Sequence, residues 1–249
     1  MKISAIIQAR MESTRLPGKV LLPLAGKPSL WWTIKRISLS SFINEIIIAT
    51  TTKESNDPIQ HFFNSVIGDF NNLSLFRYSG REDDIIGRVL NAAYQNQTDI
   101  IIDITGDCNI IDPKHIDNLI RRLTILKLDY ISNCVKRDFP DGLDIQVYWT
   151  DVLIKCRRLF YPKQHCGWNI AQHPEIFSIR HWKAGPSMHW PELGLTLDEK
   201  SDYEMLKVLF DKFGRRDPGF SSETIIKFLR ENPEYITNSN VRRKTPEEG

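Results

Sequence analysis

The stretch Ile3-Ser4-Ala5-Ile6-Ile7 is a short apolar run, and the loop that follows it, from Gln8 to Lys19, carries three cations. Short runs rich in Ile and Val are typical of buried strands. Two further runs, Ile46–Ala49 and Ile100–Ile104, are separated from the first and from each other by helix-like segments. This alternation predicts an α/β fold with a mostly parallel, twisted sheet and crossover helices on its faces.

Four helices are expected beside these strands, and their first residues indicate where they start. Ser, Asn and Asp suit such starts because their side-chain oxygens accept hydrogen bonds from the free amides of the first turn. The first helix begins near Pro28, the second opens with Ser55-Asn56-Asp57-Pro58, the third runs from Asp84 to Gln95, and the fourth runs from Asp112-Pro113 to about Lys127. Four β–α units therefore fill the first half of the chain.

The pattern changes after Asn133. Leu143, Ile145 and Val147 alternate as in a strand with one buried face, and aromatic and Pro-rich sequence follows as far as Pro191. We interpret residues 134–192 as a small β-rich lobe inserted into a single domain that spans residues 1–249. The remaining expected elements are a strand at Leu193–Leu197, helices near Ser201–Phe213 and Ser221–Arg230, and a flexible tail over residues 235–249.

The composition limits the classes of protein to which the chain can belong. Of its 249 residues, 41% are hydrophobic, which is enough for one sizeable core. With 33 basic and 31 acidic side chains, the formal net charge of +2 gives no overall attraction to nucleic acid or anionic lipid. The four cysteines form no C-x-x-C pair, the start shows no signal-peptide pattern, and no apolar run reaches the roughly 20 residues that cross a bilayer. We therefore expect a cytoplasmic protein without a nucleic-acid or membrane partner.

The loop after the first run has the composition of a phosphate-binding site. In open parallel sheets, ligands bind beyond the carboxyl ends of the strands. Arg10, Arg15 and Lys19, together with backbone N–H groups, would neutralise a triphosphate there. Pro17-Gly18 predicts a turn that aims Lys19 inward. A solvated basic loop is the alternative, and the position directly after the first strand favours the phosphate site.

The same segment carries a resemblance to a known family. Ala5-Ile6-Ile7-Gln8-Ala9-Arg10-Met11 and Ser13-Thr14-Arg15-Leu16-Pro17-Gly18-Lys19 resemble the signature of the SpsF-type cytidylyltransferases, which are related to acylneuraminate and Kdo cytidylyltransferases. The resemblance implies a Rossmann-like nucleotide-diphospho-sugar transferase fold. It also implies transfer of CMP from CTP to an acidic sugar or other anionic acceptor, in the synthesis of surface polysaccharide precursors. By this likeness, the residues that line the CTP site are Gln8, Ala9, Arg10, Ser13, Arg15 and Lys19, with Lys19, Arg10 and Arg15 acting on the phosphates.

Two carboxylates are candidate magnesium ligands. Asp107 follows the run Ile100–Ile104, so it lies at the carboxyl end of a strand, where a carboxylate can bind Mg²⁺ together with substrate phosphates. The family has a metal-binding Asp at this place. Asp198 takes the metal-facing place in a second family match, Leu195-Thr196-Leu197-Asp198. Asp112 and Asp202 fit helix caps instead.

Further matches concern the base and the acceptor. The segment from Tyr78 to Arg88 resembles the family's segment near the cytosine: Gly80 would allow close approach to the base, Arg81 is either a base contact or a surface charge, and Arg88 would reach a phosphate or anchor the loop. Side chains two residues apart on a strand share a face, so Asp144 and Gln146 share one. The resemblance implies that this face binds the acceptor. His165 is either an acceptor contact or structural. Family members are commonly homodimers.

Two positions depart from the family pattern. Glu12 stands where the family has a small residue, and a carboxylate near phosphates is unfavourable unless it points outward or pairs with a neighbour such as Arg10 or Arg15. Gln146 stands where Glu is usual, which removes one negative charge.

Three other functions are compatible with this architecture. A glycosyltransferase is disfavoured by the loop that ends in Arg15-Leu16-Pro17-Gly18-Lys19, and a nucleotidyltransferase for another nucleoside triphosphate is a further alternative. A catalytically silent nucleotide-binding scaffold is disfavoured because Lys19, Asp107 and Asp198 are all present.

Overall fold

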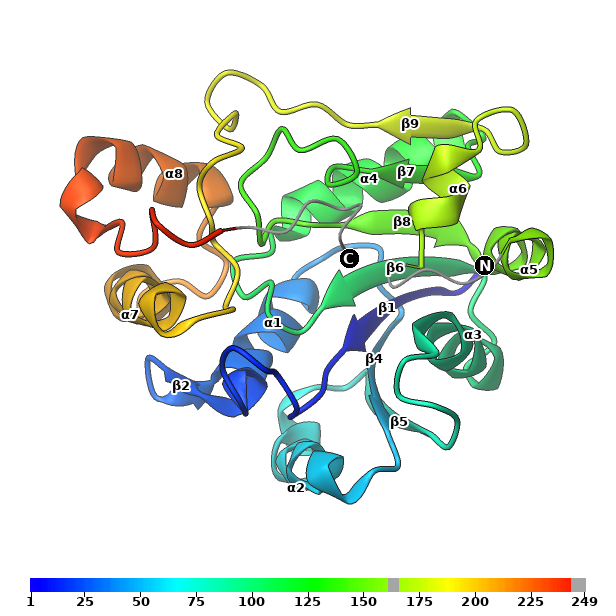
Figure 1. The fold of residues 1–249 in the computed structure, drawn as a ribbon, viewed down its shortest axis with the longest axis horizontal. Helices are drawn as coiled ribbons and strands as arrows, with labels where there is room; N and C mark the ends of the chain where they lie inside the picture. Colours follow the sequence, from blue (N-terminus) through cyan, green and yellow to red (C-terminus); the bar gives the residue numbers. More distant parts are fainter. Residues whose placement is uncertain (161–165, 243–249) are drawn as a thin grey trace.

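The computed structural model describes residues 1–160 and 166–242, and these residues form an α/β fold around a seven-stranded sheet (Figure 1). The strand order is β5-β4-β1-β6-β8-β7-β9. The strands are β1 (Ile3–Gln8), β4 (Glu45–Thr51), β5 (Leu73–Tyr78), β6 (Ile100–Thr105), β7 (Tyr130–Ser132), β8 (Gln146–Trp149) and β9 (Ile179–His181). β4 and β6 flank β1 in parallel, and only β8 runs antiparallel to its two neighbours within the described sheet. The predicted fold class is confirmed.

The four helices expected in the first half are present. They are α1 (Ser29–Ile37), α2 (Asp57–Val66), α3 (Ile85–Gln95) and α4 (Pro113–Ile125). Asp84 caps α3 by accepting from the Gly87 amide at 2.8 Å, and Asp112 caps α4 by accepting from the Lys114 amide at 3.0 Å. Asn56 precedes α2 but makes no capping bond, because its Oδ1 accepts from the Met11 amide at 2.8 Å. Asn56 therefore stabilises the loop after β1 and does not cap α2.

The central strands are buried on both faces, which explains their continuous apolar sequence. Side chains alternate between the faces, so Ile7 and Ile48 pack in one core cluster while Ile6 and Ile47 pack in another. The first cluster includes buried residues of α1, α2 and α4, and the second includes those of α3, α5 (Thr150–Leu159) and α6 (Trp168–Gln172). The sheet is thus the middle of three layers.

A third core cluster joins the end of the chain to α1. It contains Leu193, Leu195 and Leu197 with buried residues of α7 (Lys200–Leu209) and α8 (Ser222–Glu231), which lie side by side at one end of the molecule (Figure 1). The prediction of a strand at Leu193–Leu197 is wrong. This segment makes a single β-bridge, between Asp141 and Gly194. Its alternating leucines reflect burial against α7 and α8 and not a place in the sheet.

The segment interpreted as a lobe, residues 134–192, contributes β8 and β9 to the central sheet, so part of it shares the main core. Its separation as a lobe stays a prediction. In the expected tail, Asn238 is buried and donates to the Gly194 carbonyl at 2.9 Å and to Asp202 at 2.6 Å, while residues 243–249 lie outside the described part of the chain.

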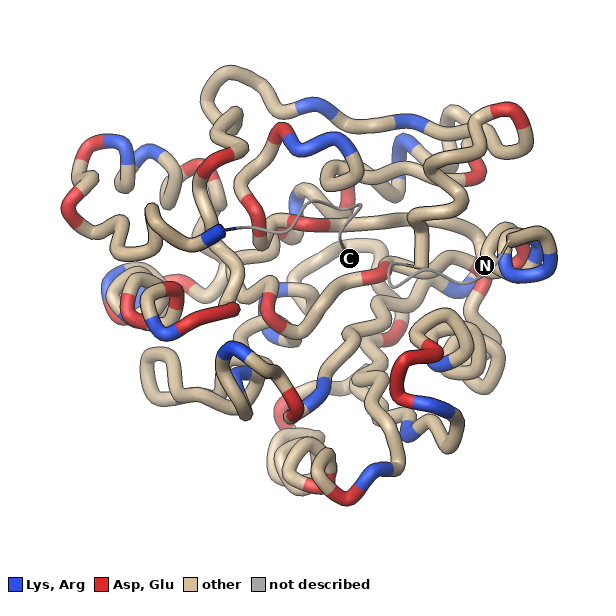
Figure 2. Tube along the Cα trace, viewed as in Figure 1, with Lys and Arg blue, Asp and Glu red and all other residues tan. Residues whose placement is uncertain are grey.

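Charges of both signs are interleaved along the trace (Figure 2). Over residues 1–160 and 166–242, no helix has the length and apolarity that a bilayer crossing requires.

Candidate active site

The loop after β1 is folded back on itself, which directs Lys19 toward the end of the sheet. Gly18 has φ +70° and donates its amide to the Met11 carbonyl at 2.9 Å. This left-handed conformation favours glycine over residues with a Cβ. Pro17-Gly18 therefore forms the expected turn, and a short 3₁₀ helix, Lys19–Leu21, begins directly after it.

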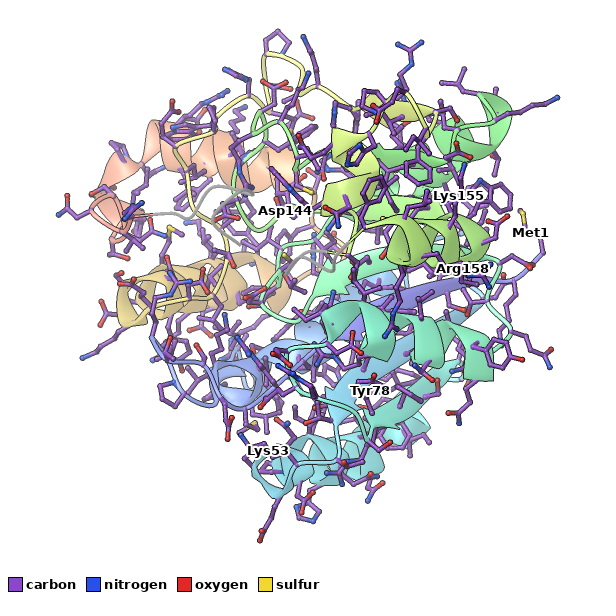
Figure 3. All side chains as sticks on the ribbon, turned by 45° about the vertical axis from the view of Figure 1, so that its right-hand side comes forward. Met1, Lys53, Tyr78, Asp144, Lys155 and Arg158 are labelled. Atoms are coloured by element: carbon purple, nitrogen blue, oxygen red, sulfur yellow. The ribbon has the colours of Figure 1, made fainter. Side chains whose placement is uncertain are left out.

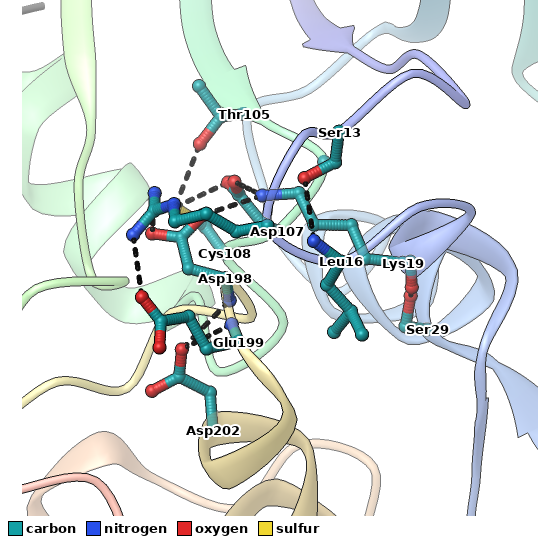
Figure 4. A network of polar contacts seen from close by, with 12 residues as sticks. Ser13, Leu16, Lys19, Ser29, Thr105, Asp107, Cys108, Asp198, Glu199 and Asp202 are labelled. Carbon is teal, nitrogen blue, oxygen red and sulfur yellow. Dashed lines mark hydrogen bonds and ion pairs between the residues drawn. The ribbon is translucent and has the colours of Figure 1, made fainter. Parts of the chain in front are cut away.

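Lys19 joins the two carboxylates that the sequence singled out. Its Nζ lies 2.6 Å from Asp107 Oδ2 and 2.7 Å from Asp198 Oδ1, in the network drawn in Figure 4. Arg15 Nη2 lies 2.9 Å from Asp198 Oδ2. The Lys19 side chain is 12% exposed, so these charges interact where water screens them less than at the surface. Two carboxylates and two cations from three distant segments thus meet at one point.

Asp107 reaches this point because β6 is the neighbour of β1 and ends beside it. Thr105 is in register with Gln8, and the Gly106 amide donates to the Gln8 carbonyl at 2.9 Å. A Cβ on Gly106 would lie 3.2 Å from that carbonyl oxygen, so this close approach suits glycine. The loops after β1 and β6 therefore leave the sheet side by side.

Asp198 reaches the same point through two backbone contacts. The Leu197 amide donates to the Asp107 carbonyl at 3.1 Å, and the Leu195 amide donates to the Asp141 carbonyl at 2.6 Å. Gly142, with φ +98°, makes this approach possible, because a Cβ there would come within 2.4 Å of the Leu195 backbone. The turn that follows Asp198 is then fixed by Asp202.

Asp202 is buried and accepts from the amides of Asp198 at 3.0 Å and Glu199 at 2.8 Å. It forms a capping box with Glu199 at the start of α7. The expectation that Asp202 serves as a cap and Asp198 faces the site agrees with this geometry.

The carboxylates keep Lys19 charged. Burial alone would lower the pKa of Lys19, but Asp107 and Asp198 outweigh it, and the pKa of Lys19 is raised. Burial likewise opposes the charge of Asp107, and the nearby ammonium holds the pKa of Asp107 below its usual range. Lys19 and Asp107 therefore each favour the charged form of the other, as the binding of an anion and a cation together requires.

A cavity of about 450 Å³ opens beside this network. Most of the candidate site residues line it: Gln8, Ala9, Arg10, Ser13, Arg15, Lys19, Arg88, Asp107, Asp144, Gln146 and Asp198. Their convergence from five separate segments is what a substrate cavity at the carboxyl edge of a parallel sheet requires.

Two candidates are not brought to the cavity. Gly80 and Arg81 are absent from its lining, and the Arg81 side chain is 82% exposed and pairs with Asp83 at 2.6 Å. Arg81 therefore has the geometry of the surface charge that the sequence left as an alternative. His165 lies outside the described residues.

Glu12 neither enters the cavity lining nor pairs with Arg10 or Arg15 among the described contacts. Its carboxylate forms an ion pair with Lys53, which lies near α2 (Figure 3) and also contacts Glu82 at 3.2 Å. Lys53 thereby links the loops that follow β1, β4 and β5. The unusual glutamate is accommodated by a cation from a different loop.

The opposite wall of the cavity holds the residues expected to face the acceptor. Asp144, labelled in Figure 3, accepts from Arg137 at 2.8 Å, and Arg137 Nη1 also lies 3.2 Å from Asp141. Burial opposes the charge of Arg137, but these two carboxylates raise the pKa of Arg137 above its usual range. Gln146 accepts from the Tyr130 hydroxyl at 2.9 Å.

Several cavity residues were missed from the sequence, Asp103 and Arg137 among them. Asp103 lines the cavity from the middle of β6, and a charged residue inside the apolar run Ile100–Ile104 is a signal that could have revealed it. Arg137 lies in an irregular segment before β8, and nothing in the local pattern distinguishes it from a surface arginine.

Comparison with known proteins identifies the family. A sequence profile described as Cytidylyltransferase matches residues 4–142, more than half of the chain. The chain belongs to the cytidylyltransferase family. Among curated relatives of this cytidylyltransferase, the spore coat polysaccharide biosynthesis protein SpsF of Bacillus subtilis is 32% identical over 243 residues, which are 93% of this chain and 95% of SpsF. The resemblance drawn from the loop after β1 is confirmed.

Other relatives carry related names. The 3-deoxy-manno-octulosonate cytidylyltransferase of Francisella philomiragia is 27% identical, over 86% of this chain and 88% of that protein. The solved structure of a cytidylyltransferase from Leptospira borgpetersenii superposes with a TM-score of 0.87 at 29% identity, and covers 98% of this chain and all of that one. The protein is therefore a CTP-dependent nucleotidyltransferase.

Proposed function

We propose that this cytidylyltransferase transfers CMP from CTP to an acidic sugar of the ulosonic acid type, or to another anionic acceptor, and releases pyrophosphate. An acceptor oxygen attacks the α-phosphorus in line, a new P–O bond forms, and the bond to the β-phosphate oxygen breaks. The product would serve the synthesis of surface polysaccharide precursors. Names of relatives support this direction: SpsF is a spore coat polysaccharide biosynthesis protein, and the Francisella protein is a 3-deoxy-manno-octulosonate cytidylyltransferase.

The observation that carries the proposal is the position of Lys19 between Asp107 and Asp198 at the edge of the cavity. Lys19, Arg10 and Arg15 supply the positive charge that a triphosphate needs, and Arg offers two-pronged contact with phosphate oxygens. Lys19 and Arg15 are already held by Asp107 and Asp198, so they stabilise charge that develops on the phosphate oxygens without reorganising. No protein nucleophile is required.

Asp107 and Asp198 have the chemistry of magnesium ligands. Their oxygens already converge on one cation, the ammonium of Lys19. In the described part of the chain, no group of three or more His, Cys, Asp or Glu side chains could hold a metal alone. This fits Mg²⁺, which binds one or two carboxylates and takes its other ligands from water and substrate phosphates. When bound, Mg²⁺ would screen the charge of the phosphate oxygens.

In this proposal the acceptor binds beside Asp144 and Gln146, which line the cavity, and Arg137 is the available cation. Arg137 uses Nη1 for its contacts with both Asp141 and Asp144, and no hydrogen bond from its Nε or Nη2 occurs within the described residues. These two donors suit a carboxylate of the acceptor. A cytoplasmic location and a homodimer are further parts of the proposal, the latter to be checked by size-exclusion chromatography with light scattering.

A pyrophosphate-release assay tests the proposal. The protein is incubated with Mg²⁺ and CTP, ATP, GTP or UTP, each against ulosonic acids, sugar phosphates and phosphonates. Release that depends on both CTP and an anionic acceptor is expected. Preference for another nucleoside triphosphate would replace the proposed donor, and release with neutral sugars alone would replace the proposed acceptor class.

The catalytically silent scaffold is the second candidate, and the same assay separates it. Binding of CTP in a calorimeter without pyrophosphate release in the presence of any acceptor would favour it over the enzyme.

A further inference from the structure

Asp103 is a buried carboxylate beneath the cavity. It lies in β6, in register with Ile6 of β1 and with Gln146 of β8, and it is 3% exposed. A buried charge is costly unless hydrogen bonds compensate it. Gln8 Nε2 donates to Asp103 Oδ1 at 2.7 Å, and the Tyr148 hydroxyl donates to Oδ2 at 3.0 Å. Asp103 is thus held by donors from both neighbouring strands.

These contacts give Gln8 one orientation. An ionised carboxylate only accepts hydrogen bonds, so the amide nitrogen of Gln8 faces Asp103. The amide oxygen then faces the other way, where Arg88 Nη2 lies 3.4 Å from it. A guanidinium only donates, so the reverse orientation of Gln8 would set donor against donor at Arg88 and acceptor against acceptor at Asp103. A series of hydrogen bonds with one donor direction therefore runs from Arg88 through Gln8 to Asp103.

Arg88 lies at the cavity end of this series of hydrogen bonds. It is 5% exposed, and its Nη1 donates to the Glu82 carbonyl at 3.0 Å. Within the described residues, its Nε is buried without an acceptor, and Arg10 has no ion-pair partner. Burial lowers the pKa of Arg88, and the nearby charge of Arg10 lowers it further. An anionic group between these cations would relieve both effects.

We propose that Asp103 is a positioning residue for nucleotide binding: it orients Gln8, which holds Arg88 beside Arg10 to receive a phosphate of the nucleotide. The inference rests on the proposed function, in which that nucleotide is CTP. Asp103 lines the cavity, but this role does not require it to touch the nucleotide. It acts through the donor and acceptor pattern of Gln8, and this distinguishes it from a residue that serves stability alone.

The test is Asp103→Asn, which keeps the shape of the side chain. The new amide can donate to Gln8, so Gln8 can turn its own nitrogen toward Arg88 and displace the guanidinium. The dissociation constant for CTP, measured by calorimetry with Mg²⁺ and no acceptor, should rise about tenfold. The KM for the acceptor should stay unchanged. A rise in the acceptor KM with unchanged CTP binding would overturn the assignment.

Gln8→Glu combined with Asp103→Asn supplies the rescue. In this double variant, the carboxylate introduced at position 8 accepts hydrogen bonds from Arg88 and from the new amide nitrogen at position 103. The amide oxygen at position 103 still accepts from Tyr148. Each donor therefore keeps an acceptor, and the net charge of the site is unchanged. CTP affinity should return to within about threefold of the wild-type value. A folded double variant with CTP affinity as low as that of D103N would overturn the proposed role of the Arg88–Gln8–Asp103 hydrogen bonds. If D103N alone does not fold, the CTP affinity of the double variant tests the proposal instead.

Ser4→Ala is the matched control. Ser4 is buried at the far end of β1, where its hydroxyl accepts from Thr98 at 2.8 Å. This variant should lose stability without any change in CTP affinity, and an equal loss of affinity would mean that buried polar contacts act only through stability.

If wild-type protein binds CTP and D103N binds it equally, this inference fails while the proposed function stands. If wild-type protein binds no nucleoside triphosphate, the proposed function fails, and the inference fails with it. If neither variant at position 103 folds, Arg88→Lys decides, and unchanged CTP affinity in that variant overturns the inference.

Discussion

Lys19 Nζ and Asp198 Oδ1 lie 2.7 Å apart although 179 residues separate them in the chain. The contact closes the site, because the loop after β1 and the segment before α7 have no strand pairing with each other in the described residues. Asp107 shares the same ammonium at 2.6 Å. Lys19, which we propose binds the triphosphate, and both candidate metal ligands are therefore organised by one another before any substrate is present.

Lys19→Ala and Asp107→Ala should each abolish turnover while the protein remains folded. Loss of Lys19 removes a preorganised charge at the phosphates, and removal of one such group typically lowers kcat by about 10²–10³-fold. Pyrophosphate release measures the rate, and circular dichroism with thermal melting reports the fold. Lys227→Ala, which breaks an exposed contact with Glu231 on α8, is the matched control and should keep full activity. Wild-type rates in either site variant would refute the assigned roles.

Local features of this fold could be predicted because they depend on neighbouring residues. Asp84 and Asp112 stand at the starts of α3 and α4 and make capping bonds there. Ser221 does the same for α8, where its hydroxyl accepts from the Thr224 amide at 3.1 Å. The meeting of the loop after β1 with Asp107 follows from strand order, because the carboxyl ends of neighbouring parallel strands lie at one edge of the sheet. The arrival of Asp198 was predicted by resemblance and not by any local pattern.

Contacts between distant loops could not be predicted. The pairing of Glu12 with Lys53 depends on how closely the loops after β1 and β4 approach. The sequence required Glu12 to point outward or to pair with a neighbour such as Arg10 or Arg15, and it did not identify Lys53 as the partner. The leucines from Leu193 to Leu197 alternate as in a strand, but alternation records which side chains are buried and not what the backbone pairs with. The unidentified partner of Glu12 and the wrong strand assignment both concern long-range geometry.

Removal of magnesium should stop the reaction, and the two carboxylates should share its binding. Chelation with EDTA is expected to abolish pyrophosphate release, and added Mg²⁺ should restore it. Asp198→Asn keeps the shape but removes one anionic ligand, so the Mg²⁺ concentration for half-maximal rate should rise about tenfold or more. Asp202→Asn, at the α7 cap, is the comparison: it should lower the melting temperature with a smaller change in the Mg²⁺ requirement. Full activity in EDTA would exclude the metal role.

Lys53→Ala should weaken substrate binding more than it affects stability. Lys53 is about half exposed, and exposed ion pairs contribute little to folding because water and salt screen them. Its contacts with Glu12 and Glu82 link the loops that follow β1 and β5, which border the proposed nucleotide site. The KM for CTP should therefore rise about threefold while kcat and the melting temperature change little. Steady-state kinetics at low and high salt measures this. The wild-type protein should approach the variant as salt increases, and a difference that persists at high salt would argue against an electrostatic link.

Asp112→Asn should reveal how the carboxyl-terminal helix is attached. Asp112 Oδ2 accepts from both the amide and the hydroxyl of Ser222 at 2.8 Å, and Oδ1 caps α4 through Lys114. Burial opposes the charge of Asp112, but His115 and the bonds from Ser222 and Lys114 hold its pKa below the usual range. A carboxyl with a depressed pKa contributes stability above its unfolded pKa, and this contribution is lost as pH falls through the folded value. Urea denaturation should therefore show the wild-type protein about 1–3 kcal/mol more stable than the variant at neutral pH. The difference should shrink in acid, below the usual aspartate pKa. A difference that does not depend on pH would mean that the side chain acts through its shape and not through its charge.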